Sequence, residues 1–286
     1  MLVIVGTIIV FGAVAGGYLM AGGEFGVLFQ PNEFVIILGA AVGAFVIGNT
    51  KTNLKAVGAG LKRALKGPTY KKGDYVELLS LLYQLFRLAK TKGMLALEQH
   101  IEKPDESTLF AAFPKVQHNH HAVEFLCDYL RMMTLGTENA NEVETLIDAE
   151  LENHHAEQHN ASHAMQLMAD GMPALGIVAA VLGVIHTMGS ITEPPEVLGH
   201  LIGAALVGTF FGVLMSYGLV APLAGAMNGV DNADSKYFQC IKAGLLAHMQ
   251  GYPPAVSIEF ARKMLWSTDR PSFYEVEEAV SALPAV

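Results

Sequence analysis

Basic residues are missing from long stretches of this 286-residue chain. All 18 lysines and arginines lie either between Lys51 and Arg131 or between Lys236 and Arg270. Charged residues of both signs make up only 16% of the chain, whereas a soluble domain carries about 25%. Because the bilayer interior excludes charge, this distribution predicts membrane spans. Four apolar runs have no lysine or arginine and almost no acidic residue: about 1–21, 34–49, 172–193 and 200–227.

The basic residues also predict the orientation of the spans. Seven of them follow the second run directly, between Lys51 and Lys72, whereas the connectors at 22–33 and 191–199 have none. The positive-inside rule places the basic side in the cytoplasm, so both termini are expected there.

Apolar residues recur every three or four positions in 74–87 and 121–135, which predicts helices between the spans. We therefore expect an all-α integral membrane protein with four transmembrane helices and a large helical cytoplasmic domain. Its segments are a transmembrane hairpin at 1–50, the cytoplasmic helical domain at 51–171, a second transmembrane hairpin at 172–227 and a cytoplasmic helical tail at 228–286.

Other absences exclude classes of function. The net charge of −9 argues against nucleic-acid binding, which needs a basic face. The chain has no GxxxxGK[ST], no GxGxxG after a strand, no HExxH and no CxxC pair, so we expect neither an enzyme nor a bound cofactor. Cys127 and Cys240 both fall in predicted cytoplasmic segments, where we expect buried thiols and no disulfide.

Three histidines, His155, His159 and His163, recur every four residues and would share one helix face. That spacing suits a metal ion, but no cysteine is near and the surroundings are polar and acidic. We predict a solvated helix face and no metal site.

The centres of the four runs contain no Asp, Glu, Lys or Arg, and Asp170 lies at an edge. Ion paths through membranes normally include an ionisable side chain, although one costs about 2.5–3.5 kcal/mol at mid-span. If this chain conducts ions, the carboxylate is expected to come from another chain, so the sequence implies a partner.

Two prolines, Pro173 and Pro222, lie near the predicted cytoplasmic ends of the third and fourth runs. A proline removes a backbone donor and can kink a helix. Pro173 either starts its helix or interrupts it, and Pro222 has apolar residues on both sides. A kinked pair at one depth would form a hinge.

Hydroxyl groups also occur in the third and fourth runs, at Thr187, Thr209, Ser216 and Tyr217. They either line a water-filled path or, for the serine and threonines, bond back to their own helix.

The stretch from Arg87 to Glu98 places three basic residues, Arg87, Lys90 and Lys92, before Gly93 and one acidic residue after it. By composition alone, this is an ordinary solvated surface.

Several motifs together resemble the MotA family, the membrane subunits of flagellar stators, over nearly the whole chain. They include GGYLM at 16–20, PALGIVAAVLG at 173–183, VGTFFG at 207–212, YGLVAPLA at 217–224, GYPP at 251–254 and RPSF at 270–273.

This resemblance implies a pentameric ring of the chain around a dimer of MotB in the bacterial inner membrane. MotB would supply the intramembrane aspartate that carries the ion. Pro173 and Pro222 match the family's coupling prolines, and Lys90 and Glu98 match its charges that face the rotor protein FliG. Lysine replaces the more common arginine at position 90, which keeps the charge but loses the planar fork.

The resemblance also bears on the choice of ion. Sodium-driven relatives usually have threonines at the places of Ala180 and Thr209, and this chain retains only Thr209. Because sodium needs oxygen ligands in place of its water, we expect protons. The predicted lining of the ion path is Ala180, Thr209 and Tyr217.

Two other interpretations remain. An energiser of the ExbB/TolQ type has similar spans but usually three, and a passive membrane scaffold would carry no ion flow. The fourth apolar run argues against the energiser.

Overall fold

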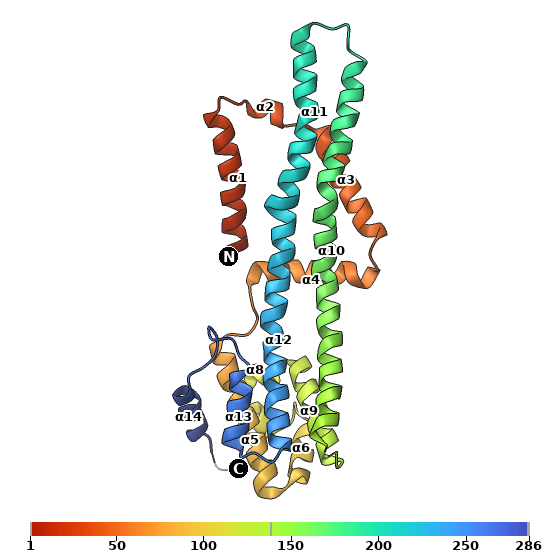
Figure 1. Ribbon diagram of the computed structural model, residues 1–286. Helices are drawn as coiled ribbons and strands as arrows, with labels where there is room; N and C mark the ends of the chain where they lie inside the picture. Colours follow the sequence, from red (N-terminus) through yellow and green to blue (C-terminus); the bar gives the residue numbers. More distant parts are fainter. Residues whose placement is uncertain (1, 138, 285–286) are drawn as a thin grey trace. The chain divides into compact units, whose positions relative to one another are not determined.

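The computed structural model describes residues 2–137 and 139–284, and every regular element in those ranges is helical (Figure 1). The prediction of an all-α chain is therefore confirmed. A 3₁₀ turn lies at Met94–Leu97 and a π-helical turn at Ser216–Val220. The α-helices are α1 (Leu2–Met20), α2 (Phe25–Leu28), α3 (Pro31–Ile47), α4 (Lys51–Lys66), α5 (Lys72–Lys92), α6 (Glu98–Ile101), α7 (Thr108–Ala111), α8 (Pro114–Gln117), α9 (His120–Thr134), α10 (Ala140–Met188), α11 (Pro195–Met215), α12 (Ala221–Met249), α13 (Pro254–Lys263) and α14 (Phe273–Ser281).

Four segments are long and apolar enough to cross a membrane, as predicted: Leu2–Met20, Phe25–Ile47, Ala140–Met188 and Pro195–Met249. The second begins earlier than the apolar run at 34–49, because α2 and the first turn of α3 extend it. The third has 49 residues, more than twice the ~20 that a span needs, so only part of α10 lies in a bilayer.

The chain divides into two compact units. The membrane unit comprises Met1–Gly67 and Ala156–Asp231, and the globular unit comprises Pro68–His155 and Asn232–Val286. The predicted segments follow topology, whereas these units follow packing. For that reason α4, expected beyond the spans, belongs to the membrane unit.

Glycines bring α10 and α11 into close contact within the membrane unit. A Cβ added at Gly212 would lie 2.8 Å from the Cα of Gly176, and one added at Gly176 would lie 2.8 Å from the carbonyl oxygen of Gly208. Small residues let helix backbones approach closely in lipid. These glycines therefore pack helices of one subunit, whereas Gly12, Gly16, Gly39 and Gly43 of α1 and α3 have open space around them.

The amphipathic helix α4 is fixed at both ends. Thr50 caps its start by accepting a hydrogen bond from the Asn53 backbone at 3.2 Å, and Gly67 ends it with φ of +90°, which favours glycine. The Arg63 guanidinium pairs with the buried Asp231 carboxylate at 2.9 Å. The amphipathic helix α4 is thereby tied to α12 by an ion pair whose carboxylate is buried and whose guanidinium is about one third exposed.

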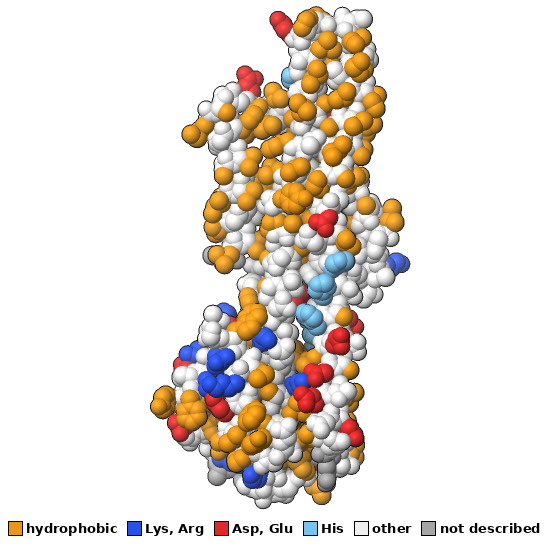
Figure 2. Space-filling model, viewed as in Figure 1, with side chains coloured by type: hydrophobic (Ala, Val, Ile, Leu, Met, Phe, Trp, Pro, Cys, Tyr) orange, Lys and Arg blue, Asp and Glu red, His pale blue; other side chains and the backbone are white. Residues whose placement is uncertain are grey.

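The globular unit has a leucine-rich core centred on α5. Six side chains of this helix are fully buried, namely Leu78, Leu79, Leu81, Leu82, Leu85 and Phe86. Tyr70 and Tyr237 stack with ring centroids 4.0 Å apart. Lysine, arginine and acidic side chains lie on the surface of this unit, whereas apolar side chains cover α1 and the hairpin of α10 and α11 (Figure 2).

Cys127 and Cys240 are free and buried, as predicted. Burial raises the pKa of the Cys127 thiol to about 12, so it stays neutral and unreactive at neutral pH.

Candidate functional site

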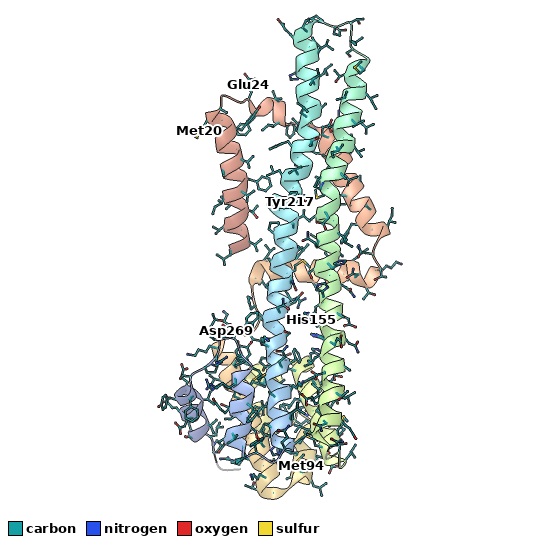
Figure 3. All side chains as sticks on the ribbon, viewed as in Figure 1. Met20, Glu24, Met94, His155, Tyr217 and Asp269 are labelled. Carbon is teal, nitrogen blue, oxygen red and sulfur yellow. The ribbon has the colours of Figure 1, made fainter. Side chains whose placement is uncertain are left out.

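The packing of α10 against α11 brings together two residues that the sequence predicts to line an ion path. A Cβ on Gly208 would lie 3.1 Å from the backbone nitrogen of Ala180, and one on Gly176 would lie 3.3 Å from the Cα of Thr209. Ala180 and Thr209 are both half-buried. The third predicted residue, Tyr217, is 64% exposed on the π-helical turn (Figure 3).

The hydroxyl groups of the membrane unit divide between the two roles that the sequence left open. The Thr187 hydroxyl donates back to the Gly183 carbonyl at 2.9 Å, and the Ser216 hydroxyl donates to the Ala169 carbonyl at 2.7 Å. Both side chains are buried. No hydrogen bond joins the Thr209 hydroxyl to another group in residues 2–137 and 139–284, so its hydroxyl, unlike that of Thr187, is not bonded back to its own helix.

Pro173 lies inside the continuous helix α10, so a helix start at this residue is wrong. A proline at position 173 has no N–H for the Ala169 carbonyl, four residues earlier. The Ser216 hydroxyl supplies that missing donor from the other helix. The sequence revealed both residues, but not that one serves the carbonyl freed by the other.

Pro222 follows the π-helical turn by two residues. The backbone N–H of Ala221 donates to the Ser216 carbonyl, five residues back instead of four. Such a turn makes room where a proline ring would otherwise press on the preceding turn. The same turn thus carries Ser216, Tyr217 and the approach to Pro222, and Ser216 links it to the Pro173 turn. One hydrogen bond thus joins the turn of Pro173 to the π-helical turn that precedes Pro222.

The structure also places one carboxylate near the start of the second candidate span. Glu33, placed by the sequence in the connector before the second run, lies in the first turn of α3 and is only 8% exposed. It faces Gly183 of α10 and Gly208 of α11. A signal was present in the sequence, because Pro31 is typical of the first helical position and starts the helix before Glu33.

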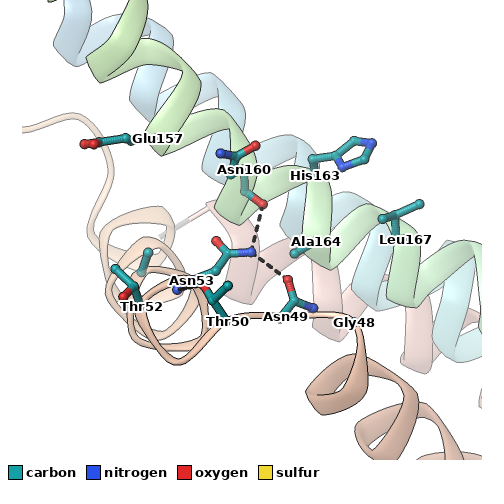
Figure 4. A pocket seen from close by; sticks show the side chains of 11 residues that line it. Gly48, Asn49, Thr50, Thr52, Asn53, Glu157, Asn160, His163, Ala164 and Leu167 are labelled. Carbon is teal, nitrogen blue, oxygen red and sulfur yellow. Dashed lines mark hydrogen bonds between the residues drawn. The ribbon is translucent and has the colours of Figure 1, made fainter.

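A polar pocket of about 490 Å³ lies between the start of α4 and the middle of α10 (Figure 4). The Asn53 amide donates to Asn49 Oδ1 at 2.6 Å and to the Asn160 carbonyl at 3.5 Å. His163 and Glu157 also line it. Amide and imidazole groups beside a lysine-bearing helix can accept a polar head group.

Histidine side chains gather along α10 (Figure 2). The rings of His159 and His163 stack with centroids 5.9 Å apart. No group of three His, Cys, Asp or Glu side chains with metal-binding geometry occurs in the described part of the chain. We therefore assign no role in metal binding to this face.

The charged residues matched to the rotor-facing positions lie on the globular unit. Lys90 is on the last turn of α5 and Glu98 begins α6, and both are exposed. Between them Gly93 adopts φ of +87°, which favours glycine. Neither Lys90 nor Glu98 forms an ion pair with any residue that the structure describes, so both charges are available to another molecule.

The other basic residues of this stretch differ from Lys90. The Arg87 guanidinium donates to the Pro284 carbonyl and to Gln84 Oε1, and it lies over the Tyr83 ring. Arg87 therefore contacts Pro284 of its own chain, which leaves Lys90 and Lys92 as the solvent-facing cations between Arg87 and Gly93.

His248 is stacked on Phe86 with ring centroids 4.5 Å apart. Burial, and then the nearby charge of Lys90, lower the pKa of His248 to about 4. The imidazole is therefore neutral at neutral pH and contributes packing instead of charge.

Comparisons with known proteins agree with this arrangement. Residues 4–93 match the family model described as motility protein A N-terminal, and residues 117–237 match the MotA/TolQ/ExbB proton channel family. The chain is 43% identical to motility protein A of Escherichia coli over 99% of its length and 96% of that protein. It is 36% identical to the chemotaxis protein LafT of Vibrio parahaemolyticus over 96% of both chains.

Two solved structures share the fold. The flagellar MotAB stator complex from Bacillus subtilis contains a chain with a TM-score of 0.71 and 26% identity, covering 90% of this chain and 92% of that chain. C. jejuni MotAB contains one with a TM-score of 0.77 at 20% identity, covering 94% and 98%. This chain therefore contains four candidate membrane spans and matches two family models.

Proposed function

Since the chain belongs to the motility protein A family, we propose that it is the membrane subunit of a flagellar stator and forms an ion channel with MotB. The relatives are motility and chemotaxis proteins, so the chain is not an enzyme. The observation that carries the proposal is the close packing of α10 and α11, which places Ala180 beside Gly208 and Thr209 beside Gly176. The Ser216 hydrogen bond also joins the π-helical turn before Pro222 to the turn of Pro173.

The conducted ion in this proposal is the proton. Of the two positions that carry threonine in sodium-driven relatives, position 209 is threonine here and position 180 is alanine, so only one has a hydroxyl. Each proton that crosses releases about 2.3 kcal/mol per 100 mV of membrane potential. An aspartate of MotB accepts the proton, and the change in its charge lets the turns of Pro173 and Pro222 shift together.

The proposed assembly is a homo-oligomer, a pentamer by family resemblance, in the bacterial inner membrane with both termini in the cytoplasm. Helix α1 has no buried residue, and the open glycine faces of α1 and α3 suit packing against other subunits. The lysines of α4 and the polar pocket beside it suit lipid head groups at the cytoplasmic surface. Lys90 and Glu98 then meet opposite charges on FliG.

The test is rescue of motility in flagellated, paralysed cells that lack their own stator. The chain is expressed with its cognate MotB, and swimming speed is measured with and without sodium. We expect sodium-independent rescue. Rescue only in sodium would keep the stator and overturn the proton assignment.

Two variants serve as the reference points of that test. Pro222→Ala should abolish swimming without removing the protein from the membrane, whereas Gly199→Ala, at an open position, should not affect it. No rescue by the unmodified chain, with the complex present in the membrane, would favour an ExbB/TolQ-type energiser or a passive scaffold.

A further inference from the structure

Glu33 is the buried acidic side chain of the membrane spans that no function yet accounts for. Its side chain is more than nine-tenths buried, and its Oε2 atom has no hydrogen-bond partner in the described chain. A carboxylate in such surroundings is costly to keep, and ionisable residues in membrane spans usually mark ion paths.

The helices around Glu33 are shaped to admit its carboxylate. A Cβ at position 208 would lie 2.7 Å from Glu33 Oε2, and a Cβ at position 183 would lie 3.3 Å from Glu33 Oε1. Glycine at both places leaves the room that the two oxygens occupy. The fit involves two helices distant in sequence from α3, so it is a built site and not an accident of one turn.

The position of this site is next to the residues of the proposed ion path. Gly208 precedes Thr209, and a Cβ added at Gly208 would lie 3.1 Å from the backbone nitrogen of Ala180. Gly208 is thirteen residues after the start of α11 at Pro195, or about 20 Å along the helix axis. Gly183 lies five residues before the end of α10 at Met188, or about 8 Å along that helix. The carboxylate therefore lies between α10 and α11, in the part of the hairpin that is nearer to its loop.

A simpler role for Glu33 is to stabilise the N-terminus of α3, where acidic residues are favourable. However, the helix has no side-chain cap, and Glu33 makes no capping box with Gln30. Helix stabilisation would also not require burial against two glycines of other helices.

No opposite charge faces Glu33 within the described part of its own subunit. The groups that face the carboxylate are Gly183 from α10 and Gly208 from α11. His186 of α10 and His200 of α11 are the histidines nearest in sequence to Gly183 and Gly208, and both are exposed. Neither α3 nor α11 contains a lysine or arginine.

We propose that Glu33 is a proton-binding site of this chain, which takes up protons on their way to the aspartate of the partner. The carboxylate accepts a proton from a hydronium ion and becomes a carboxylic acid, leaving water. It then returns the proton to a water molecule that leads onward, which regenerates the carboxylate. This inference rests on the proposed function and adds a second carboxylate to the path.

The experiment compares Glu33→Gln with Glu33→Asp in the complex with the cognate partner. Gln keeps the size of the side chain but cannot bind and release a proton. We expect rotation speed at low load, where ion transit limits the motor, to fall about tenfold or more in Glu33→Gln and less in Glu33→Asp. Co-purification with the partner should be unchanged. The matched control is Glu24→Gln, an exposed acid on the turn between α1 and α2 that should rotate normally (Figure 3).

Infrared difference spectra of the purified complex at low and high pH give a readout that does not depend on torque. The wild type should show a carboxylic-acid band that is lost in Glu33→Gln and retained in Glu24→Gln. Normal rotation of Glu33→Gln, an unchanged band, or loss of co-purification would each overturn the proposal. If the unmodified chain fails to rescue motility, the stator function fails, and the infrared band still decides on Glu33.

Discussion

The two units of this molecule use opposite means to pack their helices. In the membrane unit, Gly176, Gly208 and Gly212 let two backbones touch, whereas in the globular unit α5 buries leucines and Phe86. Water drives apolar side chains together in the globular unit, but lipid tails give no such force between spans. A close glycine contact therefore packs helices in the membrane unit, as a large buried side chain does in the globular unit.

The largest loss of stability is expected from the core of the globular unit. Phe86→Ala removes a fully buried ring and should lower the free energy of unfolding by about 3–5 kcal/mol. Thermal unfolding of the purified complex measures it. The control Leu95→Ala, at a side chain that is 73% exposed, should change it by less than about 0.5 kcal/mol.

In the membrane unit, adding a side-chain atom at a close glycine contact should lower stability, as removing a buried side chain does in the globular unit. Gly212→Ala forces a Cβ to within 2.8 Å of Gly176 and should cost about 1–3 kcal/mol, because two backbones must separate. Gly39→Ala, which meets nothing within 4 Å, is the matched control. Equal thermal stability of the two variants would contradict the close-packing account.

The hydrogen bond between Ser216 and Ala169 can be tested by a double-mutant cycle. Ser216→Ala leaves a buried carbonyl without its donor and should cost about 1–3 kcal/mol. Pro173→Ala restores a backbone N–H to that carbonyl, so Ser216→Ala should cost about 1 kcal/mol less in the Pro173→Ala background. Additive effects would mean that the serine does not compensate for the proline.

The buried histidine of the globular unit predicts a dependence on pH. The pKa of His248 is lowered to about 4, whereas an unfolded histidine titrates near 6.5. Between these values the unfolded chain binds more protons, so stability should fall as the pH is lowered from about 6.5 to 4. Unfolding midpoints across this range measure the effect. His248→Phe should remove it, and His120→Gln, at an exposed histidine, should leave it in place.

The smallest change in stability is expected at the charged surface. Reversing Lys90 or Glu98 should change the free energy of unfolding by less than about 0.5 kcal/mol, because both side chains are exposed and outside any ion pair of the described chain. Torque should nevertheless fall in both variants while assembly with the partner is retained. Lys103→Glu, at an exposed pair with Glu106, is the control for reversed charge alone. Unchanged torque in Lys90→Glu would contradict the proposal that this surface contacts the rotor.

The sequence by itself determined the four spans, because a segment enters the bilayer according to its own hydrophobicity and lack of charge, which are local properties. It also indicated the family, the prolines and the pair of Ala180 and Thr209. Only the tertiary structure decided that α10 continues through Pro173, that Ser216 serves the Ala169 carbonyl, and that Glu33 enters the spans. Each of these depends on which groups of distant helices meet, and that contact is a property of packing and not of any one segment.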